Sequence, residues 1–125
     1  MNMSVKLLSS GLLMMSVLMM GSQAVAGDSG QIKEKVVYHV NDSDNATAAL
    51  RNIGNHLDAT NGQAEIVVVT HAKGIDFLLD GAQDKNGNPY IDRVEKLKHR
   101  GVNFRVCAIT LKSRQIDPKK VVPEA

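Results

Sequence analysis

The residue with the most evident chemistry is Cys107, the one cysteine in this chain of 125 residues. As a thiolate it could attack a sulfur atom or carry one. Arg105 stands two residues earlier, so on a strand the two side chains share a face. A helical turn is predicted over residues 109–114, and a thiol near a helix N-terminus has a lowered pKa. A free cysteine is also commonly a buried, inert core residue, and the residues alone leave both roles open.

Other polar residues follow the predicted strands. Asn41 comes after the first strand and His71 after the second, while Thr110 stands just beyond Cys107. Ligands of open parallel sheets bind outside the carboxyl ends of the strands. We therefore expect Cys107 to be the reactive group at this edge, with Arg105, Thr110, His71 and Asn41 as binding and supporting residues. For His71 the alternative is a loop histidine that is hydrogen-bonded to backbone.

No metal site is predicted. The spacing of the histidines and the cysteine matches no zinc pattern. The loop DKNGNPYIDRVE (84–95) has oxygen-bearing residues at the side-chain ligand positions of an EF-hand, namely Asp84, Asn86, Asn88, Asp92 and Glu95. Pro89, however, stands where such a loop needs glycine. We expect a turn in which Asp84 and Asn88 have turn and helix-capping roles, and a calcium-binding module is the weaker alternative.

The elements that must position these residues alternate between strand and helix. β-branched and apolar runs predict strands over residues 35–40, 65–71 and 102–109. An apolar stripe predicts a helix over residues 44–58, and further helices are expected over 73–82 and 90–100. The helix expected over 90–100 ends with cationic residues followed by Gly101, which is a typical signal for the C-terminus of a helix. This order predicts an α/β fold, with a small parallel sheet that has helices on both faces.

The N-terminal residues have the plan of a secretory signal peptide. Lys6 precedes the mostly apolar run 7–20, and Ala24 and Ala26 form the small-x-small motif that signal peptidase cleaves. An uncleaved anchor would need about 20 apolar residues. We expect residues 1–26 to be a signal peptide cleaved after Ala26, residues 27–34 a flexible lead and residues 35–125 one domain in the periplasm.

Export makes a lone cysteine unusual, because exported domains with structural disulfides carry an even number of cysteines. Cys107 is therefore a buried thiol, a partner in an intermolecular disulfide or a reactive thiol. The formal net charge is only +2 and no basic stripe is present, so nucleic acid is not an expected partner. The chain has no glycine-rich phosphate loop or dinucleotide fingerprint, so no cofactor is expected. The core is small and has few aromatic residues, which favours a homo-oligomer.

Four segments resemble the DsrE/DsrF-like family of sulfur-relay proteins: KVVYHVND, AEIVVVTHAKGIDFLL, KNGNPY and RGVNFRVCAITLKSR. The resemblance implies a small flavodoxin-like domain that assembles as trimers or hexamers, with the cysteine near subunit interfaces. It also implies that Cys107 carries a persulfide between sulfur donors and acceptors, which are proteins or small sulfur compounds. Family domains usually continue into a Ser-Gly segment and another strand, so the C-terminal part here is short. The alternative function is a non-catalytic periplasmic binding or assembly module whose cysteine is buried and inert.

Overall fold

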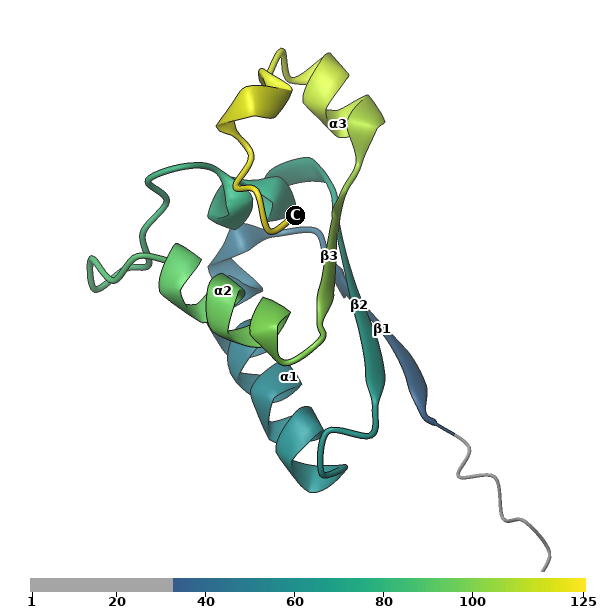
Figure 1. The fold of residues 1–125 in the computed structure, drawn as a ribbon. Coiled ribbons are helices and arrows are strands. Elements are labelled where there is room, and N and C mark those ends of the chain that lie inside the picture. The colour runs from purple at the N-terminus through teal and green to yellow at the C-terminus, as the bar shows by residue number, and fades with distance from the viewer. Residues whose placement is uncertain (1–32) are drawn as a thin grey trace, which may run out of the picture. The chain divides into compact units, whose positions relative to one another are not determined.

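The computed structural model describes residues 33–125, and the predicted signal peptide lies outside this range. Of the expected lead at 27–34, only the last two residues are described, and they lie in no helix or strand. The described chain contains three strands, three α-helices and three short 3-10 helices (Figure 1). Within residues 33–125, no helix is both long and apolar enough to cross a membrane.

The sheet consists of β1 (Lys35–Val40), β2 (Glu65–Thr70) and β3 (Asn103–Val106). They lie in the order β1-β2-β3 and both pairings are parallel. The first two strands match the prediction closely. The third is shorter than the expected 102–109, because Cys107 already precedes the next helix. The α/β class and the parallel sheet are confirmed.

Two longer helices cover the sheet. In α1 (Ala46–Ala59) the predicted stripe is buried, as Ala46, Leu50, Ile53 and Leu57 face the core. A single 3-10 turn, η1 (Ser43–Asn45), precedes it and is capped by the carboxylate of Asp42. In α2 (Ile91–His99) the residues Val94 and Leu97 are buried, and the helix ends beside Gly101 with φ of 91°, as its stop signal predicts.

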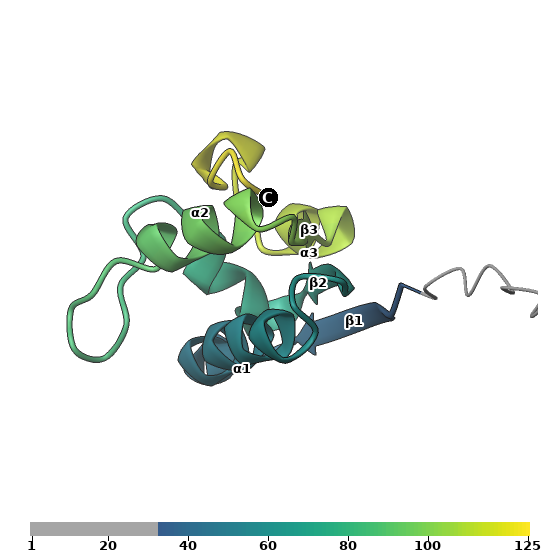
Figure 2. The same cartoon turned by 60° about the horizontal axis from the view of Figure 1, so that its bottom comes forward.

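Both α1 and α2 lie on the same side of the strands (Figures 1 and 2). This differs from the expectation of helices on both faces. The physical reason is the strand order: each β-α-β connection steps in the same direction across the sheet, and connections of one hand then place their helices on one face. Residues pointing toward the helices are buried, such as Val40, Val68 and Phe104.

The opposite side of the sheet is uncovered by α1 and α2, and we call it the open face. It consists of the alternate strand residues Lys35, Val37, His39, Glu65, Val67, Val69, Asn103 and Arg105. Val37, on the edge strand β1, is 67% exposed. Val67 and Val69 on β2 are half-buried, so an aliphatic strip lies along the open face.

The segments after β2 and at the C-terminus pack together. A 3-10 helix, η2 (Ala72–Leu78), replaces the helix expected over 73–82. The tail after η3 (Pro118–Lys120) pairs with the end of η2: the Val122 N–H donates to the Leu78 carbonyl at 2.9 Å. Val122 is buried in the core, so the tail is part of the domain.

Candidate functional site

Cys107 lies at the junction between β3 and α3 (Ala108–Ser113), at the carboxyl edge of the sheet. Its N–H donates to the Thr70 carbonyl at 3.0 Å, and its own carbonyl accepts from the Leu111 N–H at 3.1 Å. The residue is a free cysteine of intermediate burial. The thiol is therefore held in place by backbone pairing on both sides, yet it is not enclosed in the core.

The surroundings of the sulfur favour the thiolate. The hydroxyl of Thr110, followed by the N–H groups of Thr110 and Ile109, hold the pKa of the Cys107 thiol below its ordinary value. Desolvation raises the pKa but has the smaller effect. The Cys107 side chain makes no capping hydrogen bond at the start of α3. A lowered pKa favours the thiolate, which is the form that reacts.

Arg105 and His71 lie on the same side of the sheet as Cys107. Arg105 is exposed on the open face, two residues before Cys107 along the extended chain. His71 continues the alternation of β2 onto that face, and its ring stacks on that of His39 with the centroids 4.3 Å apart. His71 therefore contacts His39. The sequence did not predict this stack, because it depends on the register in which β1 pairs with β2.

Asn41 is the predicted site residue that lies farthest from Cys107. It is exposed and follows β1, whereas Cys107 follows β3, and β2 lies between them. Two strand spacings separate such positions by about 10 Å. Asn41 can therefore reach a bound partner or ligand at the carboxyl edge but not the thiol itself.

Thr110 has a second role that the sequence did not reveal. Its Oγ1 accepts from the N–H of Ala72 at 3.3 Å, and the carbonyl of Ala72 accepts from Arg114 Nη1 at 2.8 Å. Ala72 has φ of 51°, in the left-handed region that alanine rarely adopts. Arg114 also forms an ion pair with Asp76 at 2.7 Å. Side chains of α3 and the residue after it thus hold the start of η2.

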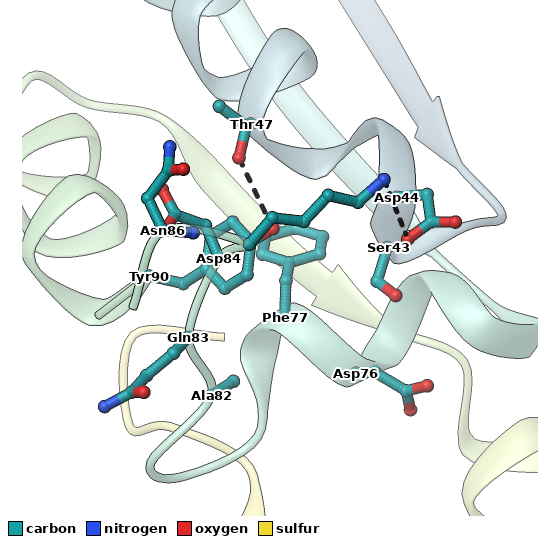
Figure 3. Close-up of a pocket in the computed structure, with 11 residues that line it drawn as sticks. Ser43, Asp44, Thr47, Asp76, Phe77, Ala82, Gln83, Asp84, Asn86 and Tyr90 are labelled. Carbon is teal, nitrogen blue, oxygen red and sulfur yellow. Dashed lines mark hydrogen bonds and ion pairs between the residues drawn. The ribbon is translucent and has the colours of Figure 1, made fainter. Parts of the chain in front are cut away.

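A cavity of about 370 Å³ lies between η1, the start of α1, η2 and the loop that precedes α2 (Figure 3). Phe77, Ala82 and Tyr90 supply its apolar walls, and Asp76 is also a lining residue, although its carboxylate points away from these three side chains in Figure 3. Thr47 donates to the Tyr90 hydroxyl at 3.4 Å, and Lys85 pairs with Asp44 at 3.8 Å across the cavity mouth. Asp76 also forms the ion pair with Arg114, so the cavity lies next to the contacts between η2 and α3.

The carboxylate of Asp84, the first residue of the EF-hand-like loop, accepts hydrogen bonds from other groups of the protein. It accepts from the N–H groups of Asn86 and Asn88 at 2.9 and 3.0 Å, and Arg93 pairs with it at 3.0 Å. The Asn88 N–H leads these contacts in holding the pKa of Asp84 below its usual value. The expected turn role of Asp84 is confirmed, while the residue before α2 is Tyr90, so Asn88 does not cap that helix. In residues 33–125 no group of three or more His, Cys, Asp and Glu side chains is placed to hold a metal ion.

Comparisons with known proteins agree with this architecture. The model of the DsrE/DsrF-like family matches residues 34–124. The solved structure of MTH1491, a protein of unknown function from Methanobacterium thermoautotrophicum, superposes with a TM-score of 0.57 at 24% sequence identity. That match covers 74% of this chain and 78% of the other. At this identity the likeness shows the fold alone, and no curated protein matches significantly. Since the family model spans most of the sequence, the chain belongs to the DsrE/DsrF-like family.

Proposed function

We propose that this protein is a periplasmic sulfur-relay protein that carries a persulfide on Cys107. The observation that carries the proposal is a half-exposed thiol whose pKa is lowered by Thr110, at the carboxyl edge of a parallel sheet. Membership of the DsrE/DsrF-like family agrees with a sulfur-relay role. Arg105, on the same face, supplies a positive charge for the bound anion.

The step needs no oxidant or cofactor. The Cys107 thiolate attacks the outer sulfur of a donor persulfide, and the sulfur–sulfur bond of the donor breaks. The donor leaves as a thiolate with the electron pair of that bond, and Cys107 becomes the persulfide. An acceptor thiolate then attacks the outer sulfur and restores the Cys107 thiolate, so the two transfers balance.

Mass spectrometry of the protein isolated from its source cell tests the proposal. The peptide that contains Cys107 should carry one additional sulfur atom, and reductant should remove it. A peptide that never carries sulfur, with a thiol that resists alkylation until the protein unfolds, would favour the alternative of a non-catalytic binding or assembly module with an inert cysteine.

We also propose that the protein is a homo-oligomer, a hexamer in which copies pair two by two through the open face. Parallel sheets are normally covered on both faces, whereas Val37 is 67% exposed here. The occupant that we propose is a second copy of the chain. Glu65 lies at the amino end of the open face and Arg105 toward its carboxyl end. Two faces packed with opposed strand directions would bring each Arg105 toward Glu65 of the other copy.

The proposed location rests on the small-x-small motif that ends at Ala26. Sequencing the N-terminus of the protein from its source cell should give Gly27 as the first residue. A mature protein that retains Met1 and fractionates with the cytoplasm would overturn both the cleavage and the location.

A further inference from the structure

The strand β3 lies at the edge of the sheet, so one side of its backbone has no strand of the described chain beside it (Figure 2). In a parallel pair, alternate residues of a strand turn their N–H and C=O groups toward the same neighbour. On β3 the odd-numbered residues face β2: the Arg105 carbonyl accepts from the Thr70 hydroxyl, and the Cys107 N–H donates to the Thr70 carbonyl. The N–H and C=O groups of Phe104 and Val106 therefore point away from β2.

These outward groups of Phe104 and Val106 have no hydrogen-bond partner among residues 33–125. Unpaired N–H and C=O groups along a sheet edge are a template for a further extended chain. The chemistry that satisfies both residues at once is an extended peptide backbone, whose own groups repeat at the same spacing. The free edge of β3 is thus complementary to a strand.

The same edge is part of a groove of about 570 Å³. Every residue of β3, Asn103–Val106, lines this groove. Leu111, Pro118 and Val121, from α3 and the C-terminal segment, add apolar side chains to the lining. A strand of this length extends over about 13 Å. The groove can therefore take a short extended segment whose alternate side chains are apolar.

The charged side chains that line the groove are both cationic, namely Lys98 and Arg105. Lys98 Nζ donates to the carbonyl of Glu124 at 2.8 Å, which is a neutral partner. Within the described part of the chain, neither cation forms an ion pair with a carboxylate. Acidic side chains on a bound segment would therefore meet a complementary charge.

We propose that the groove along β3 is the docking site for an extended acidic segment of a partner protein, which adds to the sheet as a further strand. Cys107 follows Val106 directly, so a segment paired with β3 lies beside the strand that leads to the thiol. The partner that fits this position is the protein that gives sulfur to Cys107 or takes it, and this identity rests on the proposed function.

The experiment titrates the mature protein with a capped peptide of alternating valine and glutamate and follows amide hydrogen exchange by NMR. The N–H groups of Phe104 and Val106 should exchange fast in the free protein and become protected when the peptide binds. The Arg105 N–H, which is turned toward β2, should be protected throughout. Peptide binding that leaves Phe104 and Val106 unprotected would overturn the inference.

Two N-methylated versions of the peptide separate backbone pairing from attraction between charges. One version is methylated at the amides of the valines and the other at the amides of the glutamates. Only one of these two sets can face β3, so one version should lose binding and the other should keep it. Equal binding of both versions would show that charge alone holds the peptide, and strand addition would be wrong.

A proline at the edge gives the complementary test on the protein. Val106→Pro removes an outward N–H and keeps the hydrogen bonds to β2, so it should weaken peptide binding by about threefold to tenfold. Lys35→Pro is the matched control on the other edge strand, β1. The even-numbered carbonyls of Glu34 and Val40 face β2, so the Lys35 N–H also points outward. This variant should bind the peptide as the wild type does.

Charge reversal keeps the proposal testable if Val106→Pro fails to fold. Lys98→Glu should weaken binding of the peptide several-fold, whereas Lys96→Glu, on the same helix but outside the groove lining, should leave it unchanged. Equal effects of the two variants would contradict docking in this groove.

The free protein also distinguishes a partner from a second copy. Protection of Phe104 and Val106 without peptide, lost on dilution, would show that another copy of the chain occupies the groove and would overturn the proposed partner. No step of the experiment uses sulfur, and Cys107→Ser should bind the peptide as the wild type does. Failure of the docking site would therefore leave the proposed function of Cys107 standing.

Discussion

Thr70 and Cys107 join the ends of β2 and β3 directly. The Cys107 N–H donates to the Thr70 carbonyl at 3.0 Å, and the Thr70 hydroxyl donates to the Arg105 carbonyl at 3.2 Å. Thr70 is fully buried. A single threonine thus fixes both the residue that carries the thiol and the strand that leads to it.

Replacing Thr70 should destabilise the domain at the carboxyl edge of the sheet. Thr70→Val removes the hydroxyl and leaves the Arg105 carbonyl without that donor, which should reduce the free energy of unfolding by about 1–3 kcal/mol. Thr70→Ser keeps the donor and should lose less. Urea unfolding of both variants measures the difference, and a valine variant as stable as the wild type would show that the hydroxyl has no role at this edge.

Gly74 allows η2 to approach the end of β1. A Cβ at this position would overlap the carbonyl oxygen of Val40, which is backbone and cannot turn aside. Gly74→Ala should therefore destabilise the domain by roughly 1–3 kcal/mol, as overpacking does. Gly54→Ala is the matched control, because its Cβ would meet only Arg100 Nη1 at 3.9 Å. It should stabilise α1 by up to about 1 kcal/mol. Thermal unfolding should separate the two variants in opposite directions.

Asp84 should make stability depend on pH at the acid end. Its pKa is lowered in the folded protein, led by the Asn88 N–H. The stabilising contribution is therefore present above the unfolded pKa of Asp84, and it is lost as pH falls through the lower folded pKa. Asp84→Asn should be less stable than the wild type at neutral pH, and the gap should close on acidification. A gap that stays constant from neutral pH to acid would contradict an ionised role for Asp84.

Val37 should control assembly without controlling folding. It is 67% exposed on the open face, so Val37→Asp leaves the core of the subunit intact but places a charge in the proposed interface. Light scattering should find a hexamer for the wild type and a smaller species for Val37→Asp. Lys96→Asp on α2, away from the sheet, is the control and should keep the wild-type assembly. A wild type that is monomeric at micromolar concentration would contradict the proposed interface.

Charge exchange tests the identity of the occupant. Arg105→Glu and Glu65→Arg should each weaken assembly, and the double variant should restore it if two copies meet with opposed strands. Weakening by each single variant without recovery in the double variant would point to another occupant of the open face.

Much of the fold follows from sequence pattern. The β-branched runs located β1 and β2, and the apolar stripe located α1, since both signals are local. The end of β3 was missed because the apolar residues after Val106 extend the strand pattern, although Cys107 already begins the turn into α3. The placement of helices on one face depends on strand order, which no local pattern contains.

The candidate site, too, could be predicted from the sequence only in part. Cys107 and Thr110 could be found from residue type and from their position after a strand. Ala72 and Asp76 could not, because an alanine with positive φ and an ion pair between η2 and α3 depend on tertiary contacts. The stack of His39 on His71 likewise depends on the register of β1 against β2.

The most direct test of the account is sulfur loading of Cys107. The purified mature protein is incubated with glutathione persulfide, and its intact mass is measured before and after addition of a reductant. The account predicts that the wild type gains one sulfur atom, which the reductant removes, and that a folded Cys107→Ser variant gains none. A wild type that gains no sulfur while its thiol is freely alkylated, or a Cys107→Ser variant that gains as much as the wild type, would contradict the claim that Cys107 is the sulfur carrier.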